Sequence, residues 1–284
     1  MSEPGRLDAV GAELVASWLR ETPDAAFLAA MGTSPLGVYA GLAADWLGPR
    51  PEATFLVALG TSALGIYREL GRLVRGGALD TSRLRLVQLD EYAGLADGDD
   101  RLLRTWLERD VAGPLRIPAG QVIALASPDP GDELSVATAC RDWDRAVGAA
   151  GGIDVAVLGL GPNGHLGFNE PPSPPDARTR LVALTDASLE SNARYFPAGI
   201  AVPSHAVTAG MPAILGARRK LLVVTGEPKR PILRRLLQEP VSDGLPASHL
   251  RTVGGVTLLA DRAAWPADVP VPAPGNGSRA AIPR

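Results

Sequence analysis

VAVLGLGPNGHLGFNEP, residues 155–171, is the stretch around which the rest of the chain is expected to fold. It starts as an apolar run typical of a buried strand and breaks at Gly159 and Gly161. Four polar residues then follow within eight positions: Asn163, His165, Asn169 and Glu170. An open α/β sheet presents its chemistry where such strands end, at their carboxyl ends. Glycines alone would favour an ordinary loop, but His165 and Glu170 beside them favour a functional site.

Strand-like and helix-like segments alternate on both sides of this stretch. Apolar runs typical of strands lie at 84–89, 121–126, 153–158, 221–226 and 256–261, and amphipathic helical patterns lie at 8–20, 63–75, 97–112 and 132–149. This alternation predicts one α/β domain, Rossmann-like, with a largely parallel open sheet flanked by helices. The domain is expected to span residues 1–266. A Pro/Gly-rich tail, 267–284, has a composition typical of disorder.

The N-terminal part contains a tandem repeat of one helix–strand–turn unit. Residues 12–39 align without a gap with residues 40–67, and the copies contain the turns Gly32-Thr33-Ser34 and Gly60-Thr61-Ser62. Two copies are too few for a solenoid, which needs about three. We expect them to add one βα step to the sheet by a right-handed crossover. Each turn has features that bind phosphate, namely a glycine, hydroxyls and a following helix, although Thr and Ser also cap helices for structural reasons.

The composition excludes several classes of protein. The hydrophobic share of 46% and the charged share of 21% are those of a globular chain. A net charge of −3 argues against nucleic-acid binding. The single Cys140 excludes an internal disulfide, and three histidines without ligand spacing argue against a metal site. Without a signal peptide or an apolar run of about 18 residues, we expect a cytoplasmic protein that does not bind membranes.

Two further segments bear on a site. Asp90 and Glu91 follow the predicted strand at 84–89. Two carboxylates there are either a structural cap or a catalytic pair, and their place at a strand end favours the pair. The proline-rich segment 172–182 is irregular and suits a loop or a lid over the site.

Three segments, in this order, resemble the glucosamine-6-phosphate deaminase family, which shares a fold with the 6-phosphogluconolactonases. They are LVALGTSALGIYREL, LVQLDEYAGL and VLGLGPNGHLGFNEP, and the resemblance extends over roughly residues 54–261. The lactonases match the third segment only as far as its Gly-His. The resemblance implies that glucosamine 6-phosphate and water are converted to fructose 6-phosphate and ammonia, without a metal or an organic cofactor.

The resemblance also implies roles for individual residues. Asp90 corresponds to the base that moves a proton from C2 to C1 of the sugar, while Glu91 supports it. His165 corresponds to the group that opens the sugar ring, and Glu170 would tune its imidazole. An imidazole titrates in the range that ring opening needs.

The substrate phosphate is expected on one of the two Gly-Thr-Ser turns. The second copy, Gly60-Thr61-Ser62, precedes Asp90 by one helix and one strand, as the family pattern requires. Arg194 and Lys229 match the family's cationic partners; the former offers a fork for phosphate oxygens and the latter a point charge. We therefore expect the first copy to be a scaffold repeat.

The chain departs from the family at Asn163, where an aspartate is usual. The amide keeps the hydrogen-bonding shape and loses the charge, so galactosamine 6-phosphate or another phosphosugar stays open as the substrate. A lactonase-like hydrolase that uses His165 as its base and a non-catalytic sugar-phosphate-binding regulator are the competing interpretations. Arg180 and Ser173 match the family's allosteric site, but Val182 and Ala183 replace polar partners, so we expect no strong allosteric activation. A homo-oligomer is compatible with the sequence.

Overall fold

The computed structural model describes residues 26–29, 43–47, 52–197 and 199–269. Its main sheet contains seven strands in the order β1-β10-β9-β6-β2-β3-β5, and all six pairings are parallel. The strands are β1 (Ala26–Ala29), β2 (Thr54–Val57), β3 (Arg85–Gln88), β5 (Val122–Ile123), β6 (Val155–Gly159), β9 (Arg219–Val224) and β10 (Val256–Ala260). The predicted α/β class with a parallel open sheet is confirmed.

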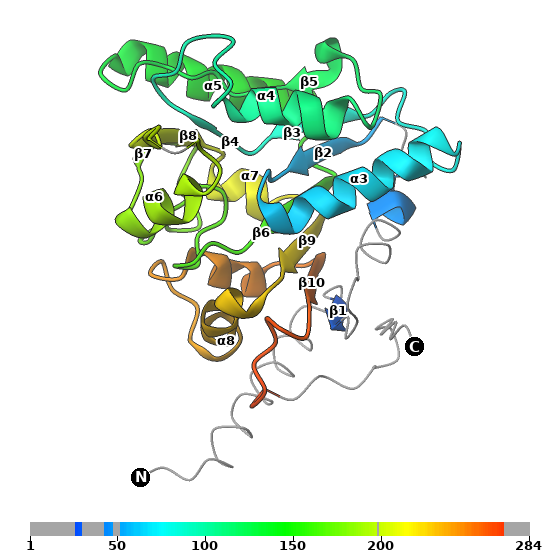
Figure 1. Cartoon of the computed structure of the whole chain (residues 1–284), viewed down its shortest axis with the longest axis vertical. Coiled ribbons are helices and arrows are strands. Elements are labelled where there is room, and N and C mark those ends of the chain that lie inside the picture. The colour runs from blue at the N-terminus through cyan, green and yellow to red at the C-terminus, as the bar shows by residue number, and fades with distance from the viewer. Residues whose placement is uncertain (1–25, 30–42, 48–51, 198, 270–284) are drawn as a thin grey trace.

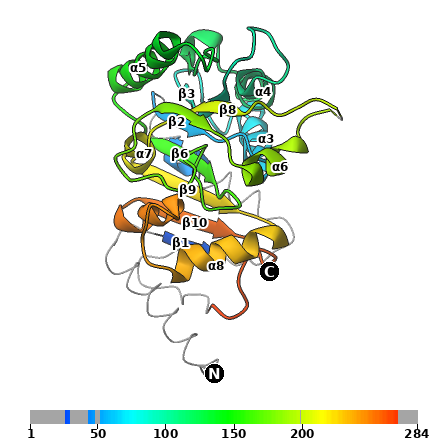
Figure 2. The same ribbon diagram turned by 90° about the vertical axis from the view of Figure 1, so that its left-hand side faces the viewer.

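Helices cover both faces of this sheet (Figures 1 and 2). They are α3 (Thr61–Arg75), α4 (Leu103–Leu107) with its π-helical continuation Glu108–Ala112, α5 (Glu133–Ala149), α6 (Asp186–Ala193), α7 (Met211–Leu215) and α8 (Arg230–Gln238). Short 3₁₀ turns lie at Ala119–Gln121, Glu227–Lys229 and Pro246–Thr252.

The strands divide the core into two hydrophobic clusters because successive side chains point to opposite faces. Phe55 and Val57 of β2 pack with α3 and α4, whereas Leu56 between them packs with α5, α7 and α8. Both faces are therefore apolar, and the buried strands read as continuous hydrophobic runs. Cys140 lies in the second of these clusters, packed as the helical pattern predicts.

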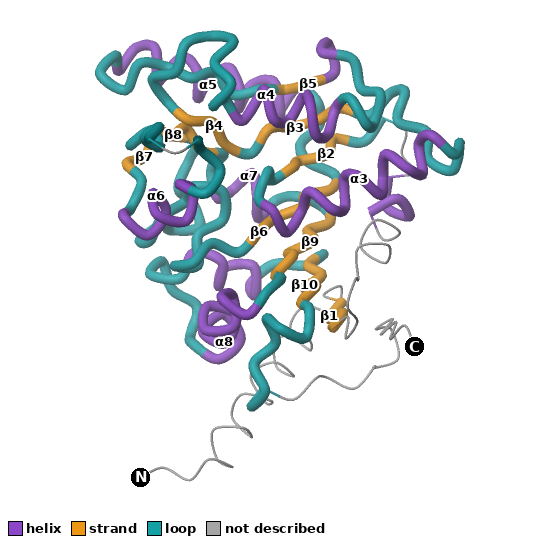
Figure 3. Tube along the Cα trace, in the orientation of Figure 1, coloured by secondary structure: helices purple, strands orange, loops and turns teal. Residues whose placement is uncertain are grey.

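A second, three-stranded antiparallel sheet was not predicted. Its order is β4-β8-β7, with β4 (Asp90–Tyr92), β8 (His205–Thr208) and β7 (Arg180–Ala183). It begins where β3 ends, so the chain passes directly from the main sheet into the small one at Asp90 (Figure 3). The end of the segment 172–182, expected to be irregular, forms the start of β7.

The repeat places equivalent strands in different environments. β1 and β2 occupy the same four positions of their copies, 28 residues apart. β1 pairs with β10 at the sheet edge, whereas β2 lies inside, between β6 and β3. Four inter-strand steps of about 4.8 Å separate them by roughly 19 Å. The described strand of the first copy is thus at the far edge, and the rest of that copy, including the first turn, Gly32-Thr33-Ser34, lies outside the described residues.

The described part of the chain ends against the body of the molecule. Val269 is buried, and its carbonyl accepts a hydrogen bond of 2.8 Å from Trp265 Nε1. The remainder of the predicted tail, 270–284, lies outside the described residues. Among the helices that the structure describes, none combines the length and the apolar character needed to cross a bilayer.

Candidate active site

A pocket of about 130 Å³ opens at the carboxyl ends of the parallel strands. Four neighbouring strands contribute to it through the turns that follow β2, β3, β6 and β9, and the end of α6 covers it. Six of the nine predicted site residues line it: Gly60, Ser62, Asp90, His165, Arg194 and Lys229. Asn163 and Glu170 lie behind His165, and Thr61 begins α3. Segments far apart in the sequence therefore converge on one pocket.

Asp90 presents a carboxyl group to the pocket from the first position of β4. Its side chain is almost buried, with a relative exposure of 9%. Burial, followed by the charge of the neighbouring Glu91, raises the pKa of Asp90 to about 7. A carboxylate with a pKa near neutrality can both accept and return a proton at physiological pH.

Glu91 points away from the pocket, as the alternation of a strand requires. It is fully buried and accepts hydrogen bonds from the backbone of Tyr92, Leu103 and Arg104. The sequence left open whether Asp90 and Glu91 form a structural cap or a catalytic pair, and the structure gives the two residues different positions. One carboxylate faces the pocket, and the other is a structural cap behind it.

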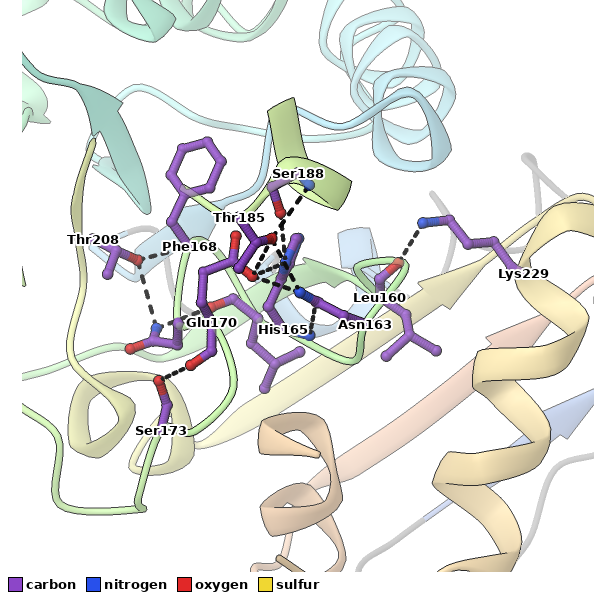
Figure 4. A network of polar contacts seen from close by, with 12 residues as sticks. Leu160, Asn163, His165, Phe168, Glu170, Ser173, Thr185, Ser188, Thr208 and Lys229 are labelled. Carbon is purple, nitrogen blue, oxygen red and sulfur yellow. Dashed lines mark hydrogen bonds and ion pairs between the residues drawn. The ribbon is translucent and has the colours of Figure 1, made fainter. Parts of the chain in front are cut away.

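His165 is held over the glycine-rich turn that follows β6. A Cβ on Gly161 would lie 2.1 Å from the imidazole, and Gly164 has a φ of +90°. The imidazole can therefore pack against the backbone only because residue 161 is glycine, and the positive φ at residue 164 also favours glycine. Its Nδ1 lies 3.3 Å from Glu170 Oε2 and 3.3 Å from Ser188 Oγ (Figure 4). The opposite nitrogen, Nε2, is left for a ligand in the pocket.

Glu170 is the centre of this network. Its Oε2 accepts hydrogen bonds from Asn163 Nδ2 at 2.6 Å and from Thr185 Oγ1 at 3.3 Å, in addition to the contact with His165. Burial raises the pKa of Glu170, but the hydrogen bonds from His165, Ser188 and Asn163 together lower it to about 2. The carboxylate is therefore ionised at neutral pH.

The geometry also explains what Asn163 does. Its amide donates to Glu170, and its Oδ1 accepts from the backbone N–H of His165 at 3.3 Å. An aspartate in this orientation would place a second carboxylate 2.6 Å from Glu170. Asn163 does not line the pocket. Its substitution for the usual aspartate therefore bears on the charge state of Glu170 rather than on contacts with the sugar.

The turn after His165 is fixed by buried polar contacts. Asn169 donates to the carbonyl groups of Leu166 and Ala209 at 2.9 Å, and the backbone N–H of Phe168 donates to Thr208 Oγ1 at 3.0 Å. Arg180 donates to Asn169 Oδ1 and to Ser173 Oγ, each at 2.8 Å. The two residues that match the family's allosteric site thus brace the turn that carries Glu170.

The other side of the pocket is electropositive. Gly60 is the N-cap of α3 and provides no side-chain cap, and the first turn of this helix contains no acidic residue. Its free N–H groups and its dipole suit an anion. Lys229 donates to Leu160 O at 2.6 Å, and Arg194 Nη2 donates to Tyr195 Oη at 3.0 Å. Burial, followed by the charge of Arg194, lowers the pKa of Lys229 to about 8.

The sequence reasoning missed two residues at the start of α6. Thr185 caps this helix by accepting from Ser188 N at 3.3 Å, and it also donates to Glu170. Ser188 is fully buried against the imidazole of His165. Threonine is a favoured N-cap residue, so Thr185 is compatible with a helix start. Nothing local in the sequence indicates the contact with His165, which lies 23 residues earlier.

Of the two alternatives for the segment 172–182, a loop or a lid, the lid is wrong. No residue of 172–182 lines the pocket, which is covered instead by Ser191, Asn192, Arg194 and Tyr195 and by Trp106 of α4. The segment 172–182 is drawn away from the pocket because Ser173 and Arg180 bond behind the turn of Glu170. Within the described residues, no group of three or more His, Cys, Asp or Glu side chains is placed to hold a metal ion.

Comparison with known proteins gives this arrangement a family. The sequence profile of the glucosamine-6-phosphate isomerases/6-phosphogluconolactonase family matches residues 39–259. The chain belongs to this family. Glucosamine-6-phosphate deaminase of Streptomyces coelicolor is 40% identical over 254 residues, which are 89% of this chain and 85% of that protein. Glucosamine-6-phosphate deaminase 1 of Bacillus subtilis is 35% identical over 265 residues, 91% of this chain and 93% of that protein.

Solved structures of the family agree with the fold. A monomeric glucosamine-6-phosphate deaminase superposes with a TM-score of 0.79 at 32% identity, covering 84% of this chain and 98% of that one. The 6-phosphogluconolactonase of Thermotoga maritima superposes with a TM-score of 0.61 at 18% identity, covering 83% and 100%. The latter similarity concerns the fold alone. The resemblance to the deaminase family, predicted from the three segments, is confirmed.

Proposed function

We propose that this enzyme converts glucosamine 6-phosphate and water to fructose 6-phosphate and ammonia. The observation that carries the proposal is that one pocket holds both Asp90, with a pKa of about 7, and the imidazole of His165 paired with an ionised Glu170. A lactonase needs a base such as His165 but has no step for Asp90. The two deaminases named above support the same activity.

His165 would open the pyranose ring. Opening moves a proton from the anomeric hydroxyl to the ring oxygen, and a single group that first accepts and then donates can carry it. The contact between Nδ1 and Glu170 leaves Nε2 as the nitrogen that exchanges this proton. Because Glu170 is ionised, it stabilises the imidazolium that forms between the two transfers.

Asp90 would then transfer the proton that isomerises the sugar. Its carboxylate removes the C2 proton of the open-chain aldehyde, and the C1 oxygen takes a proton from the ammonium group of the substrate, which leaves an enolamine. The carboxylic acid returns the proton to C1, and the nitrogen at C2 becomes an iminium. Water adds to C2 and ammonia leaves, which gives the ketose phosphate. These steps need no metal and no redox cofactor, in line with the activity that the resemblance implies.

We assign the substrate phosphate to the second Gly-Thr-Ser turn, at the N-terminus of α3. Gly60 and Ser62 line the pocket, and Lys229 and Arg194 face the same space. A dianion there would interact with both cations and with the free N–H groups of the helix. The position of β1, about 19 Å from β2 across the sheet, supports the assignment to the second copy rather than to the first.

The test is an ammonia-release assay on glucosamine 6-phosphate, with the galactosamine and mannosamine analogues and 6-phosphogluconolactone in parallel. We expect ammonia from glucosamine 6-phosphate. Asp90→Asn should lower kcat by about 10²–10⁴-fold. Lactone hydrolysis without ammonia release, or full activity of Asp90→Asn, would contradict the proposal. Faster turnover of galactosamine 6-phosphate would change the substrate and leave the reaction type unaltered.

The cellular context belongs to the same proposal. We propose a cytoplasmic location, where a single buried thiol such as Cys140 stays reduced. Light scattering coupled to size-exclusion chromatography decides between a monomer and a homo-oligomer.

A further inference from the structure

Glu91 is fully buried behind the strand that carries Asp90, and its surroundings consist of hydrogen-bond donors. Oε1 accepts from the backbone N–H groups of Tyr92 and Leu103, and Oε2 accepts from Arg104 N–H and Gln88 Nε2, all at 2.8–2.9 Å. An ionised carboxylate satisfies all four donors. A glutamine of the same size would present an N–H₂ group to two of them.

The neighbouring amide is oriented to serve this carboxylate. Gln88 Oε1 accepts the backbone N–H of Leu125 at 3.1 Å, so its Nε2 is the atom that faces Glu91. The same Nε2 donates to the backbone carbonyl of Asp90 at 2.8 Å. One buried network therefore joins β3, β4 and the carboxylate of Glu91.

Two of the donors are the first N–H groups of α4. The N-cap of this helix, Leu102, has no side-chain acceptor, and Glu91 takes that role from twelve residues before Leu103. Helix α4 in turn places Leu103 and Trp106 in the wall of the pocket. The bond from Glu91 is thus a direct link between the strand of Asp90 and the opposing wall.

We propose that Glu91 is a positioning residue of the deamination site, which fixes α4 against β4 and acts on Asp90 through its charge. The inference rests on the proposed function, in which Asp90 is the base. Glu91 itself does not contact the substrate, because its side chain is on the face of β4 turned away from the pocket and does not line the pocket. It acts by fixing the orientation of α4, which forms one wall of the pocket, and by changing the electrostatic potential at Asp90.

The charges around Asp90 single out Glu91. Burial is the largest cause of the raised pKa of Asp90. The second cause is the negative charge of Glu91, the carboxylate among the described residues that contributes to it. Tyr67 and Tyr92 also face Asp90, and burial raises the pKa of each, so both are neutral. The other titratable or charged side chains that line the pocket with Asp90 are His165, Arg194 and Lys229, which come from other elements. Removal of the charge of Glu91 should therefore lower the pKa of Asp90.

The experiment measures the pH dependence of kcat/KM for ammonia release by Glu91→Gln. We expect kcat to fall by up to about 10²-fold because α4 is displaced. The acid limb, set by Asp90, should move to lower pH, toward the ordinary aspartate value of about 3.9. Asp99→Asn is the matched control, because Asp99 binds Arg101 in the loop that enters α4 without lining the pocket. This control should leave the acid limb in place.

A second pair of variants covers the case in which Glu91→Gln does not fold. Leu103 is the first residue of α4, and Leu102 before it has an extended conformation (φ −60°, ψ 131°), so proline is compatible with this position. Leu103→Pro removes the leucine side chain and also the backbone N–H that donates a hydrogen bond to Glu91. Leu103→Ala removes the leucine side chain alone. We expect kcat of Leu103→Pro to be at least several-fold below that of Leu103→Ala.

The outcomes separate the inference from the proposed function. A folded Glu91→Gln with activity within twofold of the natural chain and an unmoved acid limb overturns the inference, as do equal kcat values for Leu103→Pro and Leu103→Ala. The proposed function fails instead if the natural chain releases no ammonia or if Asp90→Asn retains activity. A loss of activity in Glu91→Gln with a lowered acid limb supports the inference.

Discussion

The two sides of the pocket are built in opposite ways. On the side of His165, side chains bond to one another: Glu170 Oε2 has contacts with His165, Asn163 and Thr185, while Glu170 Oε1 is buried without a hydrogen-bond partner among the described residues. On the side of Gly60, the helix N-terminus has no side-chain cap. There, within the described residues, Lys229 and Arg194 have no carboxylate partner and bond instead to a carbonyl and a tyrosine hydroxyl.

This difference follows from what each side is proposed to do. A group that moves protons has to be held in one orientation before the substrate arrives, and hydrogen bonds from fixed neighbouring side chains do this. A group that binds a dianion gains most if its charge is not already neutralised by the protein. The burial of Lys229 beside Arg194, which lowers its pKa, is a cost that a bound phosphate would relieve.

The largest expected effect comes from Glu170→Gln, which removes the charge on the side of His165. Since Glu170 stabilises the imidazolium, kcat should fall by about 10²–10⁴-fold while KM changes little. Steady-state ammonia release over a range of pH measures this. Glu239→Gln, which alters an exposed ion pair with Arg235, is the control and should retain activity. A Glu170→Gln enzyme with unaltered kcat would show that the network has no part in the reaction.

The next effect concerns the stability of the fold. Asp90 has a pKa of about 7 when folded and about 3.9 when unfolded, so the unfolded chain loses this proton at lower pH. The free energy of unfolding therefore decreases between about pH 4 and pH 7, by up to about 4 kcal/mol. Asp90→Asn should be the more stable protein above pH 7 even though it is inactive. Denaturant unfolding at pH 5 and pH 8 checks this, and an Asn variant without a gain at pH 8 would refute it.

The smallest effect is expected on the phosphate side. Arg194→Ala should raise KM by roughly 10–100-fold, the value of one or two charge-assisted hydrogen bonds, and leave kcat within a few-fold. Inorganic phosphate should inhibit this variant more weakly than the natural chain. Arg218→Ala, which alters an exposed arginine near Asp154, should change neither constant. A fall in kcat without a change in KM would mean that Arg194 acts in proton transfer and would remove the distinction between the two sides.

Much of the site could be predicted because its residues follow strands directly. Asp90 comes after the apolar run at 84–89, and His165 comes after the run at 153–158. In a parallel sheet such ends meet at one edge. The roles of the glycines around His165 came from the structure, in which Gly164 has a positive φ and Gly161 makes room for the imidazole. The order of strands, helices and polar strand ends in the sequence was therefore enough to predict the α/β class and to place Asp90 and His165 at the same edge of the sheet.

Tertiary structure decided the features that depend on partners distant in the chain. β4 pairs with β8, so Asp90 lies opposite Thr208 in a small sheet that no local sequence pattern predicts. The strands β1 and β2 have related sequences, yet one lies at the edge and the other inside the sheet. Glu91 became a cap for α4, and Ser188 a partner of His165, through contacts across 12 and 23 residues. Periodicity and turn chemistry are local properties, whereas these contacts form only when packing of the whole chain brings buried donors and acceptors together.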